Sequence, residues 1–145
     1  PYFVPDEASL LALRLRAEAG LDVTVIIPER TNSALVRAAS RPAIRTLLEA
    51  GAKVRLHHRG LLHAKTLTVD DAFALVGSGN LDRRSFDLNY ELNQVVFGAE
   101  ATARVLRVQE DYIRDTTPAS LMELDARPYT GRLVDAAANV FAPLL

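Results

Sequence analysis

The stretch His63-Ala64-Lys65-Thr66-Leu67-Thr68-Val69-Asp70, followed by Gly77-Ser78-Gly79-Asn80, is the most informative part of this chain. Two runs rich in aliphatic and β-branched residues, Ala64 to Val69 and Phe73 to Val76, flank the pair Asp70-Asp71. Turn-forming acidic residues between two such runs are typical of a β-hairpin. We therefore expect a hairpin with Asp70 at its bend.

Strand geometry predicts which polar residues of this region act together. Successive side chains on a strand point to opposite faces, so His63 and Lys65 share a face and Asp70 has the opposite parity. Ser78 and Asn80 share a face on the returning segment, and Glu91 shares one with Asn93 on a strand expected from Glu91 to Phe97. Neighbouring strands can thus present five polar side chains to one pocket: His63, Lys65, Ser78, Asn80 and Glu91.

The flanking segments predict alternating strands and helices. Strands are expected at residues 2–4, 23–27 and 53–56, and helices from about 5 to 20, 34 to 50 and 99 to 116, with a mostly helical tail after 121. Pro42 predicts a kink or break in the second helix near Arg41. This order favours an α/β fold, with a mixed β-sheet covered by helices on both faces, in a single domain over residues 1–145.

Composition excludes several classes of protein. The 145 residues carry 17 basic and 18 acidic side chains, a net charge of -1, so a nucleic-acid-binding role is not favoured. No cysteine is present, which excludes disulfides and thiolate zinc sites. The start, Pro1-Tyr2-Phe3-Val4-Pro5, has neither an initiator Met nor the pattern of a signal peptide. We expect a soluble piece of a longer polypeptide.

The five polar side chains match the needs of phosphoryl transfer. Its transition state spreads negative charge over phosphate oxygens, which fixed donors and a cation stabilise. A neutral imidazole can attack phosphorus when its other nitrogen is held by a carboxylate. Because Lys65 and Asn80 supply the charge stabilisation, we expect no metal and no cofactor.

The motif His63-x-Lys65-x4-Asp70-x6-Gly77-Ser78-x-Asn80 resembles the signature of the phospholipase D superfamily. The flanking residues Gly60-Leu61-Leu62 and Leu81-Asp82-Arg83-Arg84-Ser85-Phe86, with Asn89-Tyr90-Glu91-Leu92-Asn93, are similar to the C-terminal half of bacterial cardiolipin synthases. The start Tyr2-Phe3-Val4-Pro5-Asp6 is similar too, so the resemblance covers essentially the whole chain. It implies a lobe that is the second half of a two-lobed enzyme.

The resemblance also implies roles for the motif residues. His63 is expected to be one of two active-site histidines, serving either as the nucleophile that forms a phosphohistidine or as the acid and base. Lys65 and Asn80 are expected to bind phosphate oxygens, with Ser78 beside them, and Glu91 to orient His63. Asp70 belongs to the motif, although its parity indicates a structural role. The chain carries a single copy of the motif, whereas the family needs two.

The implied reaction is phosphatidyl transfer between two phosphatidylglycerol molecules, giving cardiolipin and glycerol. The expected partners are that anionic phospholipid and a second lobe, from the same protein or from another copy of this one. The expected location of the complete protein is the bacterial cytoplasmic membrane. Two alternatives are a phosphodiesterase or nuclease that acts as a homodimer and a non-catalytic anion-binding lobe.

Some further side chains have two interpretations each. Arg83 and Arg84 are expected either to contact a lipid headgroup or to pair with nearby Asp82 or Asp87. His57 or His58 is expected to line a substrate groove or to be merely structural. The apolar residues of the tail, Leu133, Val134, Ala137, Val140 and Phe141, are expected to pack on the core rather than to contact a membrane.

Overall fold

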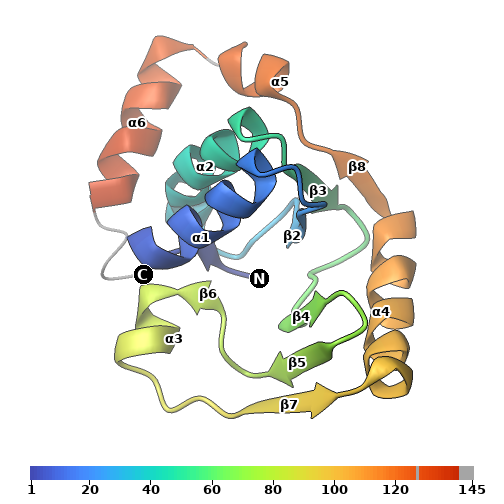
Figure 1. The fold of residues 1–145 in the computed structure, drawn as a ribbon. Helices are drawn as coiled ribbons and strands as arrows, with labels where there is room; N and C mark the ends of the chain where they lie inside the picture. Colours follow the sequence, from blue (N-terminus) through green and yellow to red (C-terminus); the bar gives the residue numbers. More distant parts are fainter. Residues whose placement is uncertain (127, 141–145) are drawn as a thin grey trace.

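The computed structural model describes residues 1–126 and 128–140, which alternate between short strands and helices (Figure 1). In chain order they are β1 (Phe3–Val4), α1 (Glu7–Glu18), β2 (Thr24–Pro28), α2 (Ala34–Glu49), β3 (Lys53–His57), β4 (Thr66–Val69), β5 (Phe73–Gly77), β6 (Leu81–Asp82), α3 (Arg83–Asp87), β7 (Asn93–Phe97), α4 (Ala99–Arg114), β8 (Thr116–Pro118), α5 (Leu121–Asp125) and α6 (Tyr129–Val140). The predicted α/β class is confirmed.

The strands of the described residues divide into three small sheets rather than one. β1 pairs with β6 in parallel, and β2 pairs in parallel with β3, which also pairs with β8 in the antiparallel sense. The third sheet is antiparallel, in the order β4-β5-β7. Parallel and antiparallel pairs therefore coexist, as predicted for a mixed sheet.

The predicted hairpin is confirmed in β4 and β5. Thr66 lies opposite Val76, and Val69 lies opposite Phe73. Asp70 has a φ of 46°, the left-handed conformation that a tight turn requires and that Asp tolerates better than most residues. The bend at Asp70 fixes the register, and it places both ends of the motif, around Lys65 and Ser78, at the opposite end of the hairpin.

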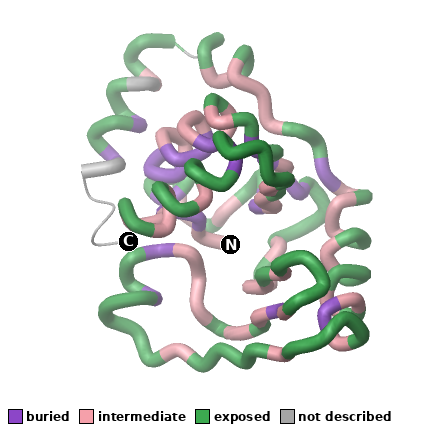
Figure 2. The backbone as a smooth tube through the Cα atoms, in the orientation of Figure 1, coloured by how far each residue is buried: buried purple, intermediate pink, exposed green. Residues whose placement is uncertain are grey.

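Helix α2 is the centre of the core, as Figure 2 shows by the buried residues gathered along it. Ser33 caps its first turn by accepting a hydrogen bond from the Val36 amide at 3.2 Å. Leu47 has no exposed surface and packs in a cluster with Ile27, Ile44 and Val54. Of the kink or break predicted at Pro42, the break does not occur, because the helix continues through this residue; a kink stays a prediction. Burial of one helix face outweighs the roughly 3 kcal/mol that an internal proline costs.

Helix α4 packs along one face of the β4-β5-β7 sheet (Figure 1). Gln109 joins the two elements, since its amide donates to the Thr66 hydroxyl at 3.0 Å and accepts from the Thr68 hydroxyl at 2.8 Å. The other face of this sheet carries apolar side chains that stay partly exposed, among them Leu67 and Phe97.

The tail differs from its prediction in two respects. The helix expected to reach residue 116 ends at Arg114, and Thr116–Pro118 forms β8. Helix α6 packs on α2 as expected, but through Ala138 and an ion pair between Arg41 and Asp135 rather than through Leu133 and Val134, which are exposed. Phe141 lies outside the described residues.

Candidate active site

His63 and Lys65 meet just before β4. The Lys65 ammonium lies 2.8 Å from Nδ1 of His63, 3.3 Å from Nε2 and 2.9 Å from the His63 carbonyl oxygen. The Lys65 ammonium therefore lies close to both ring nitrogens of His63, and in either neutral tautomer one of these nitrogens is an acceptor. The two side chains meet as expected, but residues 61–65 are not in a strand, so alternation along a strand does not account for the contact.

Ser78 and Glu91 meet just beyond β5 and before β7. The Ser78 hydroxyl donates to Oε2 of Glu91 at 2.5 Å, and Asn89 donates to Oε1 at 3.1 Å. The Leu92 amide donates to the same hydroxyl at 3.0 Å. The carboxylate of Glu91 is thus held by Ser78 and Asn89, and among the described contacts none joins it to His63. Its orienting role toward His63 stays a prediction.

Backbone pairing joins the two halves of the motif. The Gly77 amide donates to the Lys65 carbonyl at 3.1 Å, and the Ser78 amide donates to the Leu92 carbonyl at 3.0 Å. Gly77 has to lack a side chain, because a Cβ there would lie 2.0 Å from Oδ1 of Asn93 and 2.5 Å from the Leu92 oxygen. The close approach of β5 and β7 at this glycine brings Lys65, Ser78 and Glu91 to one end of the sheet.

Two buried residues that the sequence did not single out as site residues hold Asn80 in place. Asp82 is 2% exposed and caps α3 by accepting a hydrogen bond from the Ser85 amide at 2.8 Å. The Ser85 hydroxyl, buried as well, accepts from the Asn80 amide at 3.0 Å. The pattern Asp82-x-x-Ser85 is a recognisable N-cap signal, but the burial of these two residues is visible only in the structure.

The charges of the site influence one another. The Lys65 charge is the main factor that lowers the pKa of His63 below its ordinary value, and burial adds to this effect. Partial burial lowers the pKa of Lys65, while Glu91 and Asp82 oppose that shift. The hydrogen bond from Ser78 is the main factor that lowers the pKa of Glu91. Lys65 is therefore the charge that links the two halves of the site, because it influences both His63 and Glu91.

Asp70 lies at the bend, away from these groups. It lies five positions after Lys65, which corresponds to about 16 Å along an extended strand. This position agrees with the structural role that parity predicted for Asp70. Although Asp70 belongs to the motif, none of the described contacts joins it to the site.

The structure also shows the surroundings of the arginines and histidines for which the sequence allowed two roles. Arg83 pairs with Asp87 at 2.9 Å, while Arg84 is exposed and makes no ion pair with the described residues. His57 is buried, with its ring edge-on to that of Tyr112 at 6.2 Å, which agrees with the structural interpretation of this residue. His58 is exposed.

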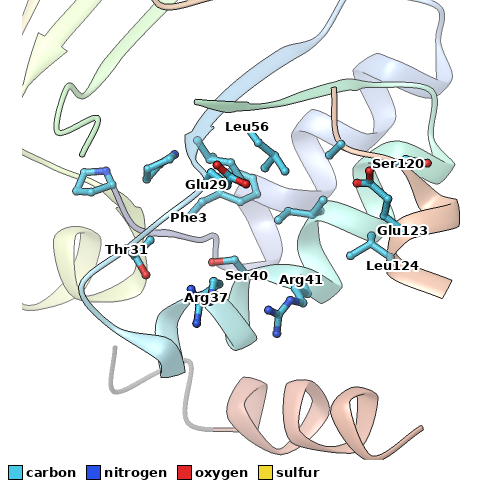
Figure 3. A pocket seen from close by; sticks show the side chains of 15 residues that line it. Phe3, Glu29, Thr31, Arg37, Ser40, Arg41, Leu56, Ser120, Glu123 and Leu124 are labelled. Atoms are coloured by element: carbon cyan, nitrogen blue, oxygen red, sulfur yellow. The ribbon is translucent and has the colours of Figure 1, made fainter. Parts of the chain in front are cut away.

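Two cavities lie near these elements. The larger one, of about 470 Å³, is lined by Lys65 and Asn80 together with mostly apolar side chains from α1, β2, β4 and β5, and we call it the apolar cleft. The smaller one, of about 240 Å³, lies between β1, α2, β3 and α5, as the side chains in Figure 3 show. It contains no residue of the motif. Of the five side chains predicted to share one pocket, Lys65 and Asn80 line the apolar cleft, whereas His63, Ser78 and Glu91 are outside its lining.

No group of three or more His, Asp and Glu side chains among the described residues is arranged to hold a metal ion. Within the same residues, no helix has the length and apolar character needed to cross a bilayer.

Comparison with curated proteins finds relatives that match over the whole chain. Cardiolipin synthase of Geobacillus thermodenitrificans is 37% identical over 145 residues, and cardiolipin synthase A of Proteus mirabilis is 41% identical over 145 residues. Both alignments include 100% of this chain, but only 29% and 30% of the respective relatives. The chain thus spans less than a third of the length of the relatives it matches.

Solved structures share the fold. A phospholipase D family member, Nuc from Salmonella typhimurium, superposes with a TM-score of 0.72 at 22% identity, over 81% of this chain and 77% of Nuc. Phosphatidylserine synthase of Haemophilus influenzae gives a TM-score of 0.75 at 20% identity, over 100% of this chain and 40% of the synthase. The family model described as "Cardiolipin synthase, PLD-like domain" matches residues 1–112. The chain therefore belongs to the phospholipase D-like family of cardiolipin synthases.

Proposed function

We propose that this chain is one catalytic lobe of a two-lobed enzyme that transfers a phosphatidyl group from one phosphatidylglycerol to another, giving cardiolipin and glycerol. The observation that carries the proposal is the cluster formed by His63, Lys65, Ser78 and Glu91, with Asn80 beside Lys65 in the apolar cleft. The family membership and the names of the relatives support the choice of lipid. The second lobe, from the same protein or another copy, supplies the second histidine.

In the first step a histidine nitrogen attacks the phosphorus, a P–N bond forms and the P–O bond to the departing glycerol breaks. The other histidine gives its proton to that glycerol oxygen. In the second step the hydroxyl of another phosphatidylglycerol gives its proton to the same histidine and attacks the phosphorus, which breaks the P–N bond. His63 takes one of these two roles, and the histidine of the second lobe takes the other.

The remaining polar groups stabilise charge. Lys65 and Asn80 bind the phosphate oxygens, on which negative charge grows in the transition state. Ser78 holds Glu91 beside them, and the Glu91 carboxylate balances the Lys65 charge. The exposed guanidinium of Arg84 is available to an anionic headgroup, and the complete protein works at the bacterial cytoplasmic membrane, where that lipid is found.

The test is a product analysis with the complete protein that contains this chain. The purified protein is incubated with phosphatidylglycerol vesicles, and lipids and glycerol are quantified by mass spectrometry. We expect cardiolipin and glycerol in equal amounts, and a loss of about 100-fold or more in Lys65→Met. Phosphatidic acid without cardiolipin would instead identify a phospholipase, and cleavage of plasmid DNA lost in His63→Gln would identify a nuclease.

A further inference from the structure

The apolar cleft joins a single cation to an apolar chamber. Lys65 is the one charged side chain among the described residues that line it, and Asn80 lies in the same lining. We propose that the cleft binds an acyl chain of the phospholipid whose phosphate contacts Lys65 and Asn80. The inference rests on the proposed function and adds a specificity site to it.

The walls of the cleft come from elements far apart in the sequence. Leu67 of β4 and Leu75 of β5 lie opposite each other in the sheet register and form one wall. Leu13 of α1 and Val25 of β2 contribute to the rest of the lining. Leu67 is still 48% exposed, so an apolar ligand in the cleft would remove its surface from water, which is the favourable part of hydrophobic binding.

Size and charge together favour a lipid over a nucleic acid. A volume of about 470 Å³ lies within the range of small-molecule sites. A nucleic-acid strand carries one phosphate per nucleotide and needs a row of cations along its path. One cation beside an apolar lining instead complements one phosphate attached to a hydrocarbon chain.

The experiment compares two ligands that share a headgroup phosphodiester and differ in acyl chains. Glycerophosphoglycerol and dihexanoylphosphatidylglycerol, the latter kept below its micelle concentration, are titrated into the 145-residue chain by calorimetry. The lipid should bind more tightly, by a factor of about four for each methylene that the cleft buries. Lys65→Met should weaken the binding of both ligands.

Matched variants test whether the preference for the acylated ligand arises in the apolar cleft. Leu67→Gln, which lines the cleft, should lower the preference for the lipid about tenfold or more. Val69→Gln, on the same strand and the same face but outside the lining, should leave it unchanged. Ala12→Phe should obstruct the cleft from the exposed surface of α1, and Ala8→Phe on the same helix is its control. Circular dichroism verifies that each variant is folded.

Equal affinity for the two ligands would overturn the inference. Equal effects of Leu67→Gln and Val69→Gln on the preference for the lipid would overturn it too. Displacement of the lipid by a single-stranded oligonucleotide would be a third contradicting result. Failure of the proposed function has a different signature. If the complete protein forms no cardiolipin while the chain still prefers the acyl ligand in a Leu67-dependent way, the cleft assignment stands and the reaction assignment falls.

Discussion

The capping carboxylate of Asp82 offers a sharp test of how the site is built. Asp82 is 2% exposed, it caps α3 at the Ser85 amide, and Ser85 in turn accepts from the Asn80 amide. Asp82→Ala therefore removes the cap and loosens the support of a phosphate-binding residue. Asp82→Asn keeps an oxygen in the capping position but removes the charge near Lys65.

The expected magnitude follows from the burial of the donor. Loss of an N-cap costs about 0.5–2 kcal/mol, and a buried amide left without a partner lies in the upper part of that range. We expect Asp82→Ala to lose about 1.5 kcal/mol of unfolding free energy and Asp82→Asn only a few tenths, because the two side chains cap about equally well. For a chain of this length 1.5 kcal/mol lowers the melting temperature by about 5 °C.

The assay is urea unfolding followed by circular dichroism, with calorimetry for the melting temperature. The rate of lipid transfer by the complete protein is measured in parallel. Both variants should lower this rate, and Asp82→Asn should do so only because the charge near Lys65 is lost. Equal destabilisation by Asp82→Ala and Asp82→Asn would refute the capping argument.

Four further outcomes are expected. Gly77→Ala should destabilise the chain by about 1–3 kcal/mol in urea unfolding, because its methyl group meets β7, whereas Gly79→Ala, with contacts of 3.3 Å or more, should cost clearly less. Lys65→Met should raise the pKa of His63 in an NMR titration, since a neighbouring cation disfavours the imidazolium; an unchanged or lower pKa contradicts this. Leu47→Ala should cost about 3 kcal/mol, and a loss below 1 kcal/mol would contradict its place in the core. The monomeric chain alone should hydrolyse bis(p-nitrophenyl) phosphate no faster than its His63→Gln variant.

The parts of the fold with local signals were predictable. The Asp70-Asp71 turn between two aliphatic runs identified the β4-β5 hairpin. The spacing of His63 and Lys65 also predicted their proximity, although the two residues meet before the strand begins. These features depend on residues close in sequence, so the local sequence pattern is sufficient to predict them.

Features that depend on distant contacts were not predictable. Strand β8 forms because Thr116–Pro118 pairs with Arg55–His57, some sixty residues earlier. Pro42 was expected to kink or break α2, but α2 is continuous, because the burial of one helix face outweighs the local preference of proline. Asp82 appeared only as an ion-pair candidate, since its N-cap signal does not reveal that the carboxylate is buried.

The most direct test of the central claim is the rate of cardiolipin formation by the complete protein carrying His63→Gln. Loss of an acid–base histidine removes about 10²–10⁴-fold of rate, so we predict a loss of at least 100-fold in His63→Gln. His58→Gln, which changes an exposed histidine five residues earlier, should keep nearly the wild-type rate. Wild-type activity in His63→Gln, or the same loss in His58→Gln, would contradict the assignment of this lobe as half of the active site.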